Sequence, residues 1–285
     1  MTRIDVSEFR ERGAVLVKGF FRREEVERVR QDAKRVFLAQ LLRRGLVASE
    51  GVTEKEFEAA LFEYFRLHLS EFVNCGKQAQ HLISLHRLSL DARVTDTLAQ
   101  LGMEFPNVST RPVLYFNSRH LAKEEVYWRV FAHQDWRSMQ GSLDSVVVWV
   151  PLADVDASLG ALQVVPGSHR LGLLTTEVVN SFGKVDRFKD EDFVSVEVEQ
   201  GDALVFSSLL VHRSGVNVTD SIRWSCHFRY NNLAEGTFIE RGYPHPYLYK
   251  PQEELITPGF PSPDQVGRIF LPAPTAAAGV GGRED

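Results

Sequence analysis

Apolar positions recur with helical spacing near the start of the chain. A short apolar run at 14–21, AVLVKGFF, predicts a strand that leads into a turn. The segment 22–45 then predicts one long helix, and Gly45 is the expected residue just beyond its end. The apolar stripe of this helix should consist of Val26, Val29, Ala33, Phe37 and Leu41. Such a stripe gives the helix one face to bury against a core.

Two capping patterns predict further helices in the first hundred residues. Thr53 and Glu56 have the spacing of a capping box before the apolar-periodic run FEAALFEYFRLHL. Either Ser89 or Asp91 is expected to start a last helix that ends at Gly102. The first hundred residues are therefore predicted to be mostly helical.

From about residue 110 the pattern changes to short β-rich runs separated by turn residues. Pro166-Gly167 and Gly201-Asp202 are typical turn pairs. Seven or more short strands without helical patterns between them predict a sandwich or a barrel. The runs are RPVLYF, YWRVFAH, SVVVWVPL, ALQVVPGS, FVSVEVEQGD, ALVFSSLLVH and IRWSCHFRY.

The helical pattern of the first hundred residues and the β-rich pattern after them suggest one domain with a helical flank. We expect residues 1–256 to form this domain, with the mainly helical flank over 1–105 and the β core over 106–235. A lid-like segment should follow over 236–256, because it mixes aromatic and polar groups. Residues 257–285 are rich in Pro, Gly and Ala, which predicts a partly disordered tail.

Composition narrows the class of partner. Lys and Arg number 33 against 38 Asp and Glu, so the net charge is −5. The chain has no long basic run of the kind that would predict binding to nucleic acid or to an anionic membrane. A small molecule is the expected partner, and the oligomeric state stays open. Cys75 and Cys226 are too few and too far apart for a disulfide scaffold. The longest apolar run, 146–153, is too short to span a bilayer, and no targeting segment is visible, so we expect a cytoplasmic protein.

The stretch FAHQDWRSM at 131–139 carries the first chemical signal. If it is a strand, His133 and Asp135 share a face and converge on one point, which indicates a metal site. A single His-x-Asp pair also arises by chance, so a third ligand is needed. The apolar run at 203–212 supplies one, because we expect a strand that ends at His212. Two imidazoles and one carboxylate leave open metal positions, as in oxygen-activating non-haem Fe(II) sites.

The run IRWSCHFRY carries a polar stripe. Arg223, Ser225, His227 and Arg229 share one face of this predicted strand, and the other face is apolar. Burial of such a stripe is costly unless it meets something charged. A hairpin after His212 could bring Arg223 near the metal, where its guanidinium could clamp an anionic cosubstrate such as a 2-oxo diacid. An alternative for Arg229 is pairing with a surface carboxylate.

These motifs, taken in order, resemble the phytanoyl-CoA dioxygenase family of Fe(II)/2-oxoglutarate-dependent oxygenases. The matching pieces are HQD at 133–135, VVVWVPLADVDASLGALQVVPGSHR at 146–170 and GDALVFSSLLVHRSGVNVTDSIR at 201–223. FRERGAVLVKGFFRREEVERVR also looks like the family's N-terminal strand and helix. The resemblance covers roughly residues 8–235. It implies a mostly β fold, with a double-stranded β-helix (jelly-roll, cupin-like) core and an N-terminal helical flank.

The resemblance also implies roles for individual residues. The implied iron ligands are His133, Asp135 and His212. Arg223 would grip the distal carboxylate of 2-oxoglutarate, and Ser214 would assist it. Asn117 or Tyr115 is expected to support the end of 2-oxoglutarate that binds iron. The chain departs from the family pattern here, because a longer, charged RHLAKEEVYWR separates these two residues from the His-x-Asp pair.

The implied function is a 2-oxoglutarate-dependent dioxygenase that uses Fe(II) and O2. It would hydroxylate an unactivated C–H bond of a small molecule or carrier-linked metabolite, with succinate and CO2 as co-products. Related halogenases lack the carboxylate ligand, so the presence of Asp135 favours hydroxylation. One alternative is a metal-binding cupin-like protein without oxygenase turnover, such as a sensor or an isomerase. Another is desaturation or cyclisation by the same oxidation chemistry.

Residues just past the ligands are candidates for contact with the substrate. Trp136, Arg137 and Gln140 would lie at the barrel mouth, although an ordinary polar loop explains them equally well. His227 could border the pocket or could be an interior histidine with its hydrogen bonds satisfied. For His169 we expect a turn residue with a structural hydrogen bond.

Overall fold

The computed structural model describes residues 3–122, 130–179, 182–247, 257–258 and 262–265. Contacts between residues divide the chain into two compact units, Met1–Pro246 and Tyr247–Asp285. The first unit contains the helical flank and the β core. Residues 248–256 of the predicted lid-like segment and most of the predicted tail lie outside the described residues. No helix among the described residues is long and apolar enough to cross a membrane.

The helical flank follows the predicted pattern. Its helices are α1 (Val6–Arg12), α2 (Arg23–Arg43), α3 (Glu54–Leu67), α4 (Leu69–Ala79), α5 (Ile83–Ser89) and α6 (Ala92–Gln100). All five residues of the predicted stripe on α2 are fully buried. Gly45 follows the helix with φ +68°, a conformation that glycine adopts at little cost. The predicted capping box at Thr53 and Glu56 starts α3, and Asp91 rather than Ser89 caps α6.

The β core consists of two antiparallel sheets and a hairpin. The larger sheet has the strand order β1-β8-β3-β10-β2, the smaller has the order β7-β4-β9, and β5 pairs with β6. The strands are β1 (Ala14–Val17), β2 (Pro106–Asn117), β3 (Val146–Pro151), β4 (Leu162–Val164), β5 (Glu177–Val179), β6 (Phe182–Lys184), β7 (Val194–Val196), β8 (Ala203–Ser207), β9 (His212–Ser214) and β10 (Arg223–Asn232). Short helical turns are η1 (Arg119–Leu121), α7 (Trp136–Met139), η2 (Ser168–Leu171), η3 (Asp190–Asp192) and α8 (Gly236–Glu240).

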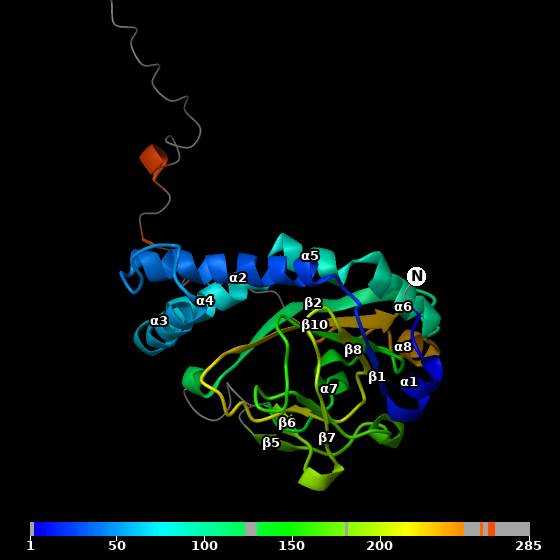
Figure 1. Cartoon of the computed structure of the whole chain (residues 1–285). Helices are drawn as coiled ribbons and strands as arrows, with labels where there is room; N and C mark the ends of the chain where they lie inside the picture. The colour runs from blue at the N-terminus through cyan, green and yellow to red at the C-terminus, as the bar shows by residue number, and fades with distance from the viewer. Residues whose placement is uncertain (1–2, 123–129, 180–181, 248–256, 259–261, 266–285) are drawn as a thin grey trace, which may run out of the picture. The chain divides into compact units, whose positions relative to one another are not determined.

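The two faces of the larger sheet have different neighbours. Helices α2 and α5 lie along one side of β2 and β10 (Figure 1). Trp224 of β10 faces them and stacks edge-on with Phe37 of α2 and Phe116 of β2, with ring centroids 6.3 and 4.5 Å apart. The opposite face packs on the smaller sheet, where Trp149 and Leu162 belong to one buried apolar cluster. Arg223, Ser225, His227 and Arg229 share the face of β10 opposite Trp224, as predicted, and in the structure this face is turned toward the space between the sheets.

Two details of the predicted strands are wrong. The segment 131–139 is not a strand, because only His133 pairs, in an isolated bridge with His212, and α7 begins at Trp136. The run 203–212 breaks after Ser207, and His212 begins β9 in the other sheet instead of ending β8. The fold class agrees with the prediction in its antiparallel sheets and helical flank. The term mostly β fits loosely, because helices hold more of the described residues than strands do.

Candidate functional site

Three predicted metal ligands meet between the two sheets. One ligand atom each from His133, Asp135 and His212 lies within 4.8 Å of the others. The bridge between the two histidines fixes their backbones, because each amide donates to the other's carbonyl, at 3.0 and 3.1 Å. Asp135 is the residue immediately before α7, and its helical backbone turns the carboxylate toward the imidazoles. The three groups therefore converge through a bridge and a helix start, not through one continuous strand.

Both imidazoles are oriented by backbone carbonyls. Nδ1 of His133 lies 2.8 Å from the carbonyl of Phe131, and Nδ1 of His212 lies 3.0 Å from the carbonyl of Leu210. A carbonyl only accepts hydrogen bonds, so each Nδ1 carries a proton and each Nε2 is the ring atom that could bind a metal. A backbone carbonyl on the far ring nitrogen is the usual support of a metal-binding histidine. This donor set fits a metal ion such as Fe(II).

Charge at the triad is balanced by an arginine. Asp135 is 3% exposed, and Arg229 donates to both of its oxygens, Nε to Oδ2 at 3.2 Å and Nη2 to Oδ1 at 3.1 Å. Burial alone would raise the pKa of Asp135, but Arg229 and the two histidines outweigh it and hold that pKa well below its usual value. Burial, with the neighbouring His133, lowers the pKa of His212 to about 4. The carboxylate is thus ionised and His212 neutral near pH 7.

The partner of Arg229 differs from the one suggested as an alternative from the sequence. Pairing with a surface carboxylate was the option for this residue, but its partner is the buried Asp135. Two strand positions separate it from His227 on the inner face of β10. The sequence placed Arg229 on the correct face, but the short helix that presents Asp135 to it was not visible in the pattern.

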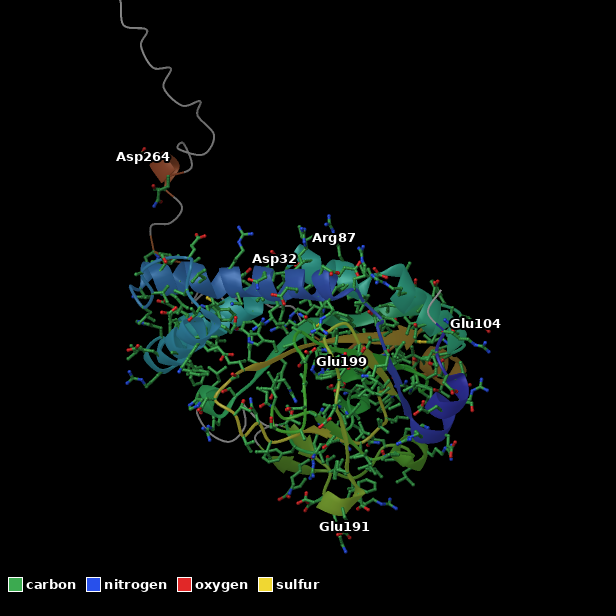
Figure 2. All side chains as sticks on the ribbon, in the orientation of Figure 1. Asp32, Arg87, Glu104, Glu191, Glu199 and Asp264 are labelled. Carbon is green, nitrogen blue, oxygen red and sulfur yellow. The ribbon has the colours of Figure 1, made fainter. Side chains whose placement is uncertain are left out.

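Arg223 is a buried cation with no acidic partner among the described residues. Charged side chains such as Arg87, Glu104 and Glu191 lie at the surface (Figure 2), whereas Arg223 is 1% exposed. Burial lowers its pKa to about 10, so it stays protonated at neutral pH. Nη1 donates to the carbonyl of Gly160, Nη2 donates to Ser214 Oγ at 3.4 Å, and Nε has no partner among the described residues. A buried charge left in this state is costly unless an anion binds to it.

The structure places Ser214, Tyr115 and Asn117 beside Arg223. The Arg223 guanidinium lies 5.9 Å from the centre of the Tyr115 ring, and burial raises the pKa of that phenol. Tyr115 also bonds Ser214 through its side chain. Asn117 lies directly opposite Arg223 in the β2–β10 register, and its buried amide nitrogen and oxygen have no partner among the described residues. These residues surround the end of the site that would take the distal carboxylate, and support of the iron-binding end stays a prediction.

Further unpaired polar atoms lie on the same inner face. They are Ser225 Oγ, both ring nitrogens of His227, and Trp149 Nε1, all buried and without a hydrogen-bond partner among the described residues. His227 and Trp149 are direct neighbours in the β10–β3 register. Buried polar groups are normally paired, so a row of unpaired ones marks a place where a polar ligand or water binds. The site therefore fits a polar cosubstrate as well as a metal.

The predicted substrate contacts lie in α7 and at its end. Trp136 Nε1 donates to the carbonyl of Ser142 at 3.1 Å, and Arg137 Nη2 donates to the carbonyl of Leu174 at 2.7 Å. Gln140 is exposed and ends the helix with φ +49°. These hydrogen bonds of Trp136 and Arg137 fix the local backbone, and contact with a substrate stays a prediction for all three residues. His169 is near Arg10, with Nε2 3.2 Å from the Arg10 carbonyl, as expected for a structural hydrogen bond.

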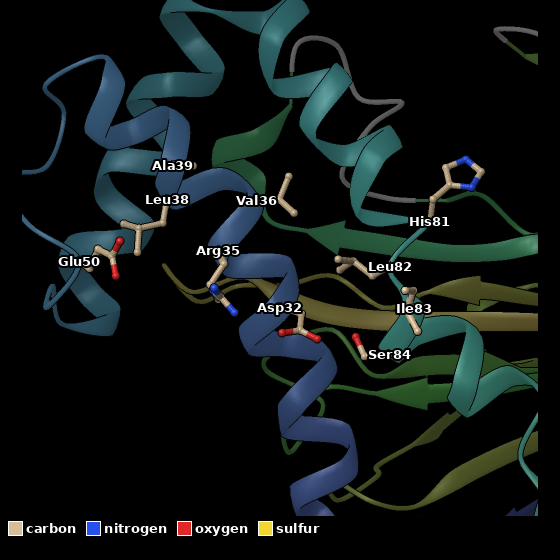
Figure 3. Close-up of a pocket in the computed structure, with 10 residues that line it drawn as sticks. All are labelled: Asp32, Arg35, Val36, Leu38, Ala39, Glu50, His81, Leu82, Ile83 and Ser84. Carbon is tan, nitrogen blue, oxygen red and sulfur yellow. The ribbon is translucent and has the colours of Figure 1, made fainter. Parts of the chain in front are cut away.

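A separate pocket lies in the helical flank. It has a volume of about 650 Å³ and lies between α2 and the segment joining α4 to α5 (Figure 3). Its lining comprises Asp32, Arg35, Val36, Leu38, Ala39, Glu50, His81, Leu82, Ile83 and Ser84. None of the residues predicted for the metal or cosubstrate belongs to it, so it is distinct from the triad.

Comparisons with known proteins agree with this geometry. The sequence profile of the phytanoyl-CoA dioxygenase (PhyH) family matches residues 9–225. The human protein "Phytanoyl-CoA dioxygenase, peroxisomal" is 21% identical over 239 residues, which cover 77% of this chain and 66% of that protein. A "Methylphosphonate hydroxylase" from Gimesia maris is 32% identical over 114 residues, covering 39% of this chain and 43% of that protein. The chain thus spans less than two thirds of the length of these relatives.

Solved structures show the same fold. The epimerase SnoN, crystallised with Fe3+, alpha ketoglutarate and nogalamycin RO, superposes with a TM-score of 0.50 at 19% identity. The superposition covers 80% of this chain and 82% of that one. At this identity the likeness concerns the fold alone.

Proposed function

Because the chain belongs to the phytanoyl-CoA dioxygenase family, we propose that it is an Fe(II)- and 2-oxoglutarate-dependent dioxygenase that hydroxylates an unactivated C–H bond. The substrate would be a small molecule or a carrier-linked metabolite. One observation carries the proposal: a metal-type triad and a buried arginine, with no acidic partner in the part of the chain that the structure describes, lie in the same space between the sheets. The geometry thus offers one place for a metal and another for a dianion.

His133, Asp135 and His212 would hold Fe(II) through the two Nε2 atoms and one carboxylate oxygen. The carbonyls behind the imidazoles keep these nitrogens aimed inward before the metal binds, which reduces the reorganisation that binding requires. Three protein ligands leave the other metal positions for cosubstrate and O2. Fe(II), 2-oxoglutarate and O2 are the cofactors that the triad and the family support.

Arg223 would bind the distal carboxylate of 2-oxoglutarate, and Ser214 would add a hydroxyl. Nε of Arg223 is available for a second bond to the same carboxylate, which gives bidentate recognition. Together the metal and cosubstrate supply the oxidation: 2-oxoglutarate loses CO2 and becomes succinate, and the two atoms of O2 go to succinate and to the new hydroxyl. The burial of Asp135, His212 and Arg223 excludes bulk water from this space.

Two alternatives use the same pocket. A cupin-like metal protein without turnover would have no need of a buried guanidinium opposite the metal, so Arg223 argues against it. The second alternative is that the same iron and 2-oxoglutarate chemistry has an outcome other than hydroxylation. Epimerisation is one such outcome, since SnoN has a similar fold and is described as an epimerase. Desaturation and cyclisation belong to this second group.

The remaining sequence-based expectations become part of the proposal. We propose that residues 1–256 act as one domain. The first compact unit of the structure ends ten residues earlier, at Pro246. A cytoplasmic location and the absence of nucleic-acid and membrane partners rest on composition, and the human relative is named as peroxisomal. Trp136, Arg137, Gln140 and His227 would face the substrate.

The test is 2-oxoglutarate turnover by the Fe(II)-loaded protein. Succinate should form when O2 is present, and it should fall to background in Asp135→Ala and Arg223→Ala. Arg87→Ala, a surface arginine on α5, is the control and should leave turnover unchanged. Absence of succinate from the wild-type protein with iron bound and candidate substrates supplied would contradict the proposal.

Mass spectrometry then separates the outcomes for each candidate substrate. Hydroxylation adds one oxygen atom, which carries label when labelled O2 is used. Desaturation or ring closure removes two hydrogens, and epimerisation leaves the mass unchanged. Only the first outcome agrees with the proposed hydroxylase.

A further inference from the structure

We propose that His227 binds the 2-oxo acid end of 2-oxoglutarate by donating a ring N–H to its C1 carboxylate. This inference rests on the proposed function, since it assigns one more contact to the same cosubstrate. It changes the role of His227 from the substrate contact expected from the sequence to a cosubstrate-binding residue.

The first observation is that the ring has no partner. Both nitrogens of His227 are buried and make no hydrogen bond within the part of the chain that the structure describes. The ring contacts Tyr115 edge-on, with centroids 6.2 Å apart, which leaves its polar atoms unsatisfied. A buried donor without an acceptor is costly, and native proteins pair such groups with a ligand or an ordered water.

The second observation is the place of the ring between the two ends of the site. On the inner face of β10, Arg223 lies four residues before His227, and Arg229, which binds the ligand Asp135, lies two residues after it. Arg229, Asp135, Arg223 and His212 all lie near enough to its imidazole to influence the pKa of His227. His227 therefore lies along the path from the metal ligands to the guanidinium.

The dimensions of the opposite strand match this path. Ser214, which contacts Arg223, is two residues from His212 on β9, about 7 Å along an extended strand. The two carboxylates of 2-oxoglutarate are separated by four C–C bonds, or about 5 Å. A molecule of this length would reach from Arg223 to the metal, so its C1 end would come to the triad side of the inner face of β10, where His227 lies.

The chemistry of the ring suits a carboxylate. Burial, followed by the positive charge of Arg229, holds the pKa of His227 well below its usual value. The neutral imidazole has one N–H donor and one bare nitrogen. The donor can bond a carboxylate oxygen, and the bare nitrogen is left for a water or a substrate hydroxyl.

The test measures 2-oxoglutarate affinity by anaerobic calorimetry on the Mn(II)-loaded protein. His227→Leu should weaken binding about tenfold or more, the loss expected for one hydrogen bond to a charged group. Mn(II) affinity should stay unchanged, because the ring is no metal ligand. His227→Asn, which retains a donor, should recover part of the loss. His81→Leu, in the separate pocket of Figure 3, is the matched control and should bind like the wild type.

A truncated ligand identifies the end that His227 contacts. 2-Oxopentanoate keeps the 2-oxo acid and lacks the distal carboxylate, so His227→Leu should weaken it by the same factor, whereas Arg223→Ala should leave it unaffected. Equal 2-oxoglutarate affinity in His227→Leu and wild type would overturn the inference alone, as would a His227 effect that disappears with 2-oxopentanoate. Failure of the wild-type protein to bind 2-oxoglutarate would instead overturn the proposed function.

Discussion

The pair formed by Asp135 and Arg229 gives the sharpest prediction about the metal-free protein. Arg229→Met removes the guanidinium that bonds both oxygens of a carboxylate only 3% exposed. The methionine fills similar space, so the main loss is the compensating charge. An uncompensated buried charge after removal of one partner costs about 3–5 kcal/mol. We expect the free energy of unfolding to fall by about this amount.

Arg213 provides a matched control for this substitution. Its side chain is 14% exposed, close to the 13% of Arg229, but its partner Asp190 is 90% exposed. Exposed pairs contribute only about 0–1 kcal/mol, and the stacking of Arg213 on Phe193 adds a similar amount, so Arg213→Met should cost clearly less. Urea unfolding of the metal-free variants measures both losses.

Two further measurements separate charge from packing. The double variant Asp135→Asn with Arg229→Met should be more stable than Arg229→Met alone, because no charge remains to be compensated. Added Mn(II) should also recover part of the loss in Arg229→Met, since a metal at Asp135 replaces the missing positive charge. A loss below about 1 kcal/mol, or a double variant as unstable as the sum of both single variants, would refute the reasoning.

Three other outcomes follow from the site. Arg223→Ala should weaken 2-oxoglutarate binding by about 2–5 kcal/mol, roughly 30-fold to several thousand-fold. Arg223→Lys should be intermediate, because lysine keeps the charge without the guanidinium fork. Anaerobic calorimetry with Mn(II) measures both affinities, and unchanged affinity would exclude the assigned role. The pKa of His212 is about 4 in the fold against 6.5 unfolded, so the unfolded chain takes up the extra proton between these values and the metal-free protein loses up to ~3 kcal/mol as pH falls from 6.5 to 4. Urea unfolding at several pH values should show that slope reduced in His212→Asn, and an unchanged slope would contradict the assignment. Gly160→Ala should destabilise the fold and lower 2-oxoglutarate affinity, because φ is +82° and the added Cβ would lie 2.9 Å from backbone atoms beside the carbonyl that accepts from Arg223. Gly172→Ala is the control for backbone strain alone, because its φ is +68° and the space around it is open. Thermal melts should show both variants destabilised, but Gly172→Ala should leave the affinity intact.

Elements with strong local signals were predictable from the sequence. The stripe on α2 and the capping box of α3 are read from residues three or four apart, and both are present in the structure. The polar face of β10 was equally accessible, because alternation alone separates Arg223 from Trp224. The ligands His133, Asp135 and His212 were found from residue type and motif order, and the structure brings them together.

What the sequence missed depends on contacts between distant segments. Asp135 reaches the histidines through the start of α7, and four residues of helix give too short a periodic pattern to recognise. The break between β8 and β9 falls inside a continuous apolar run, because Leu210 and Val211 are buried although they lie outside both strands. The pairing of Arg229 with Asp135 joins residues 94 positions apart, a separation for which the pattern of either segment carries no signal.

The most direct test of the whole account is a crystal structure of the protein grown anaerobically with Fe(II) and 2-oxoglutarate. The account predicts one iron within bonding distance of His133 Nε2, His212 Nε2 and an oxygen of Asp135, with the distal carboxylate of 2-oxoglutarate on Arg223. Iron bound elsewhere, or a 2-oxoglutarate molecule that does not touch Arg223, would contradict it.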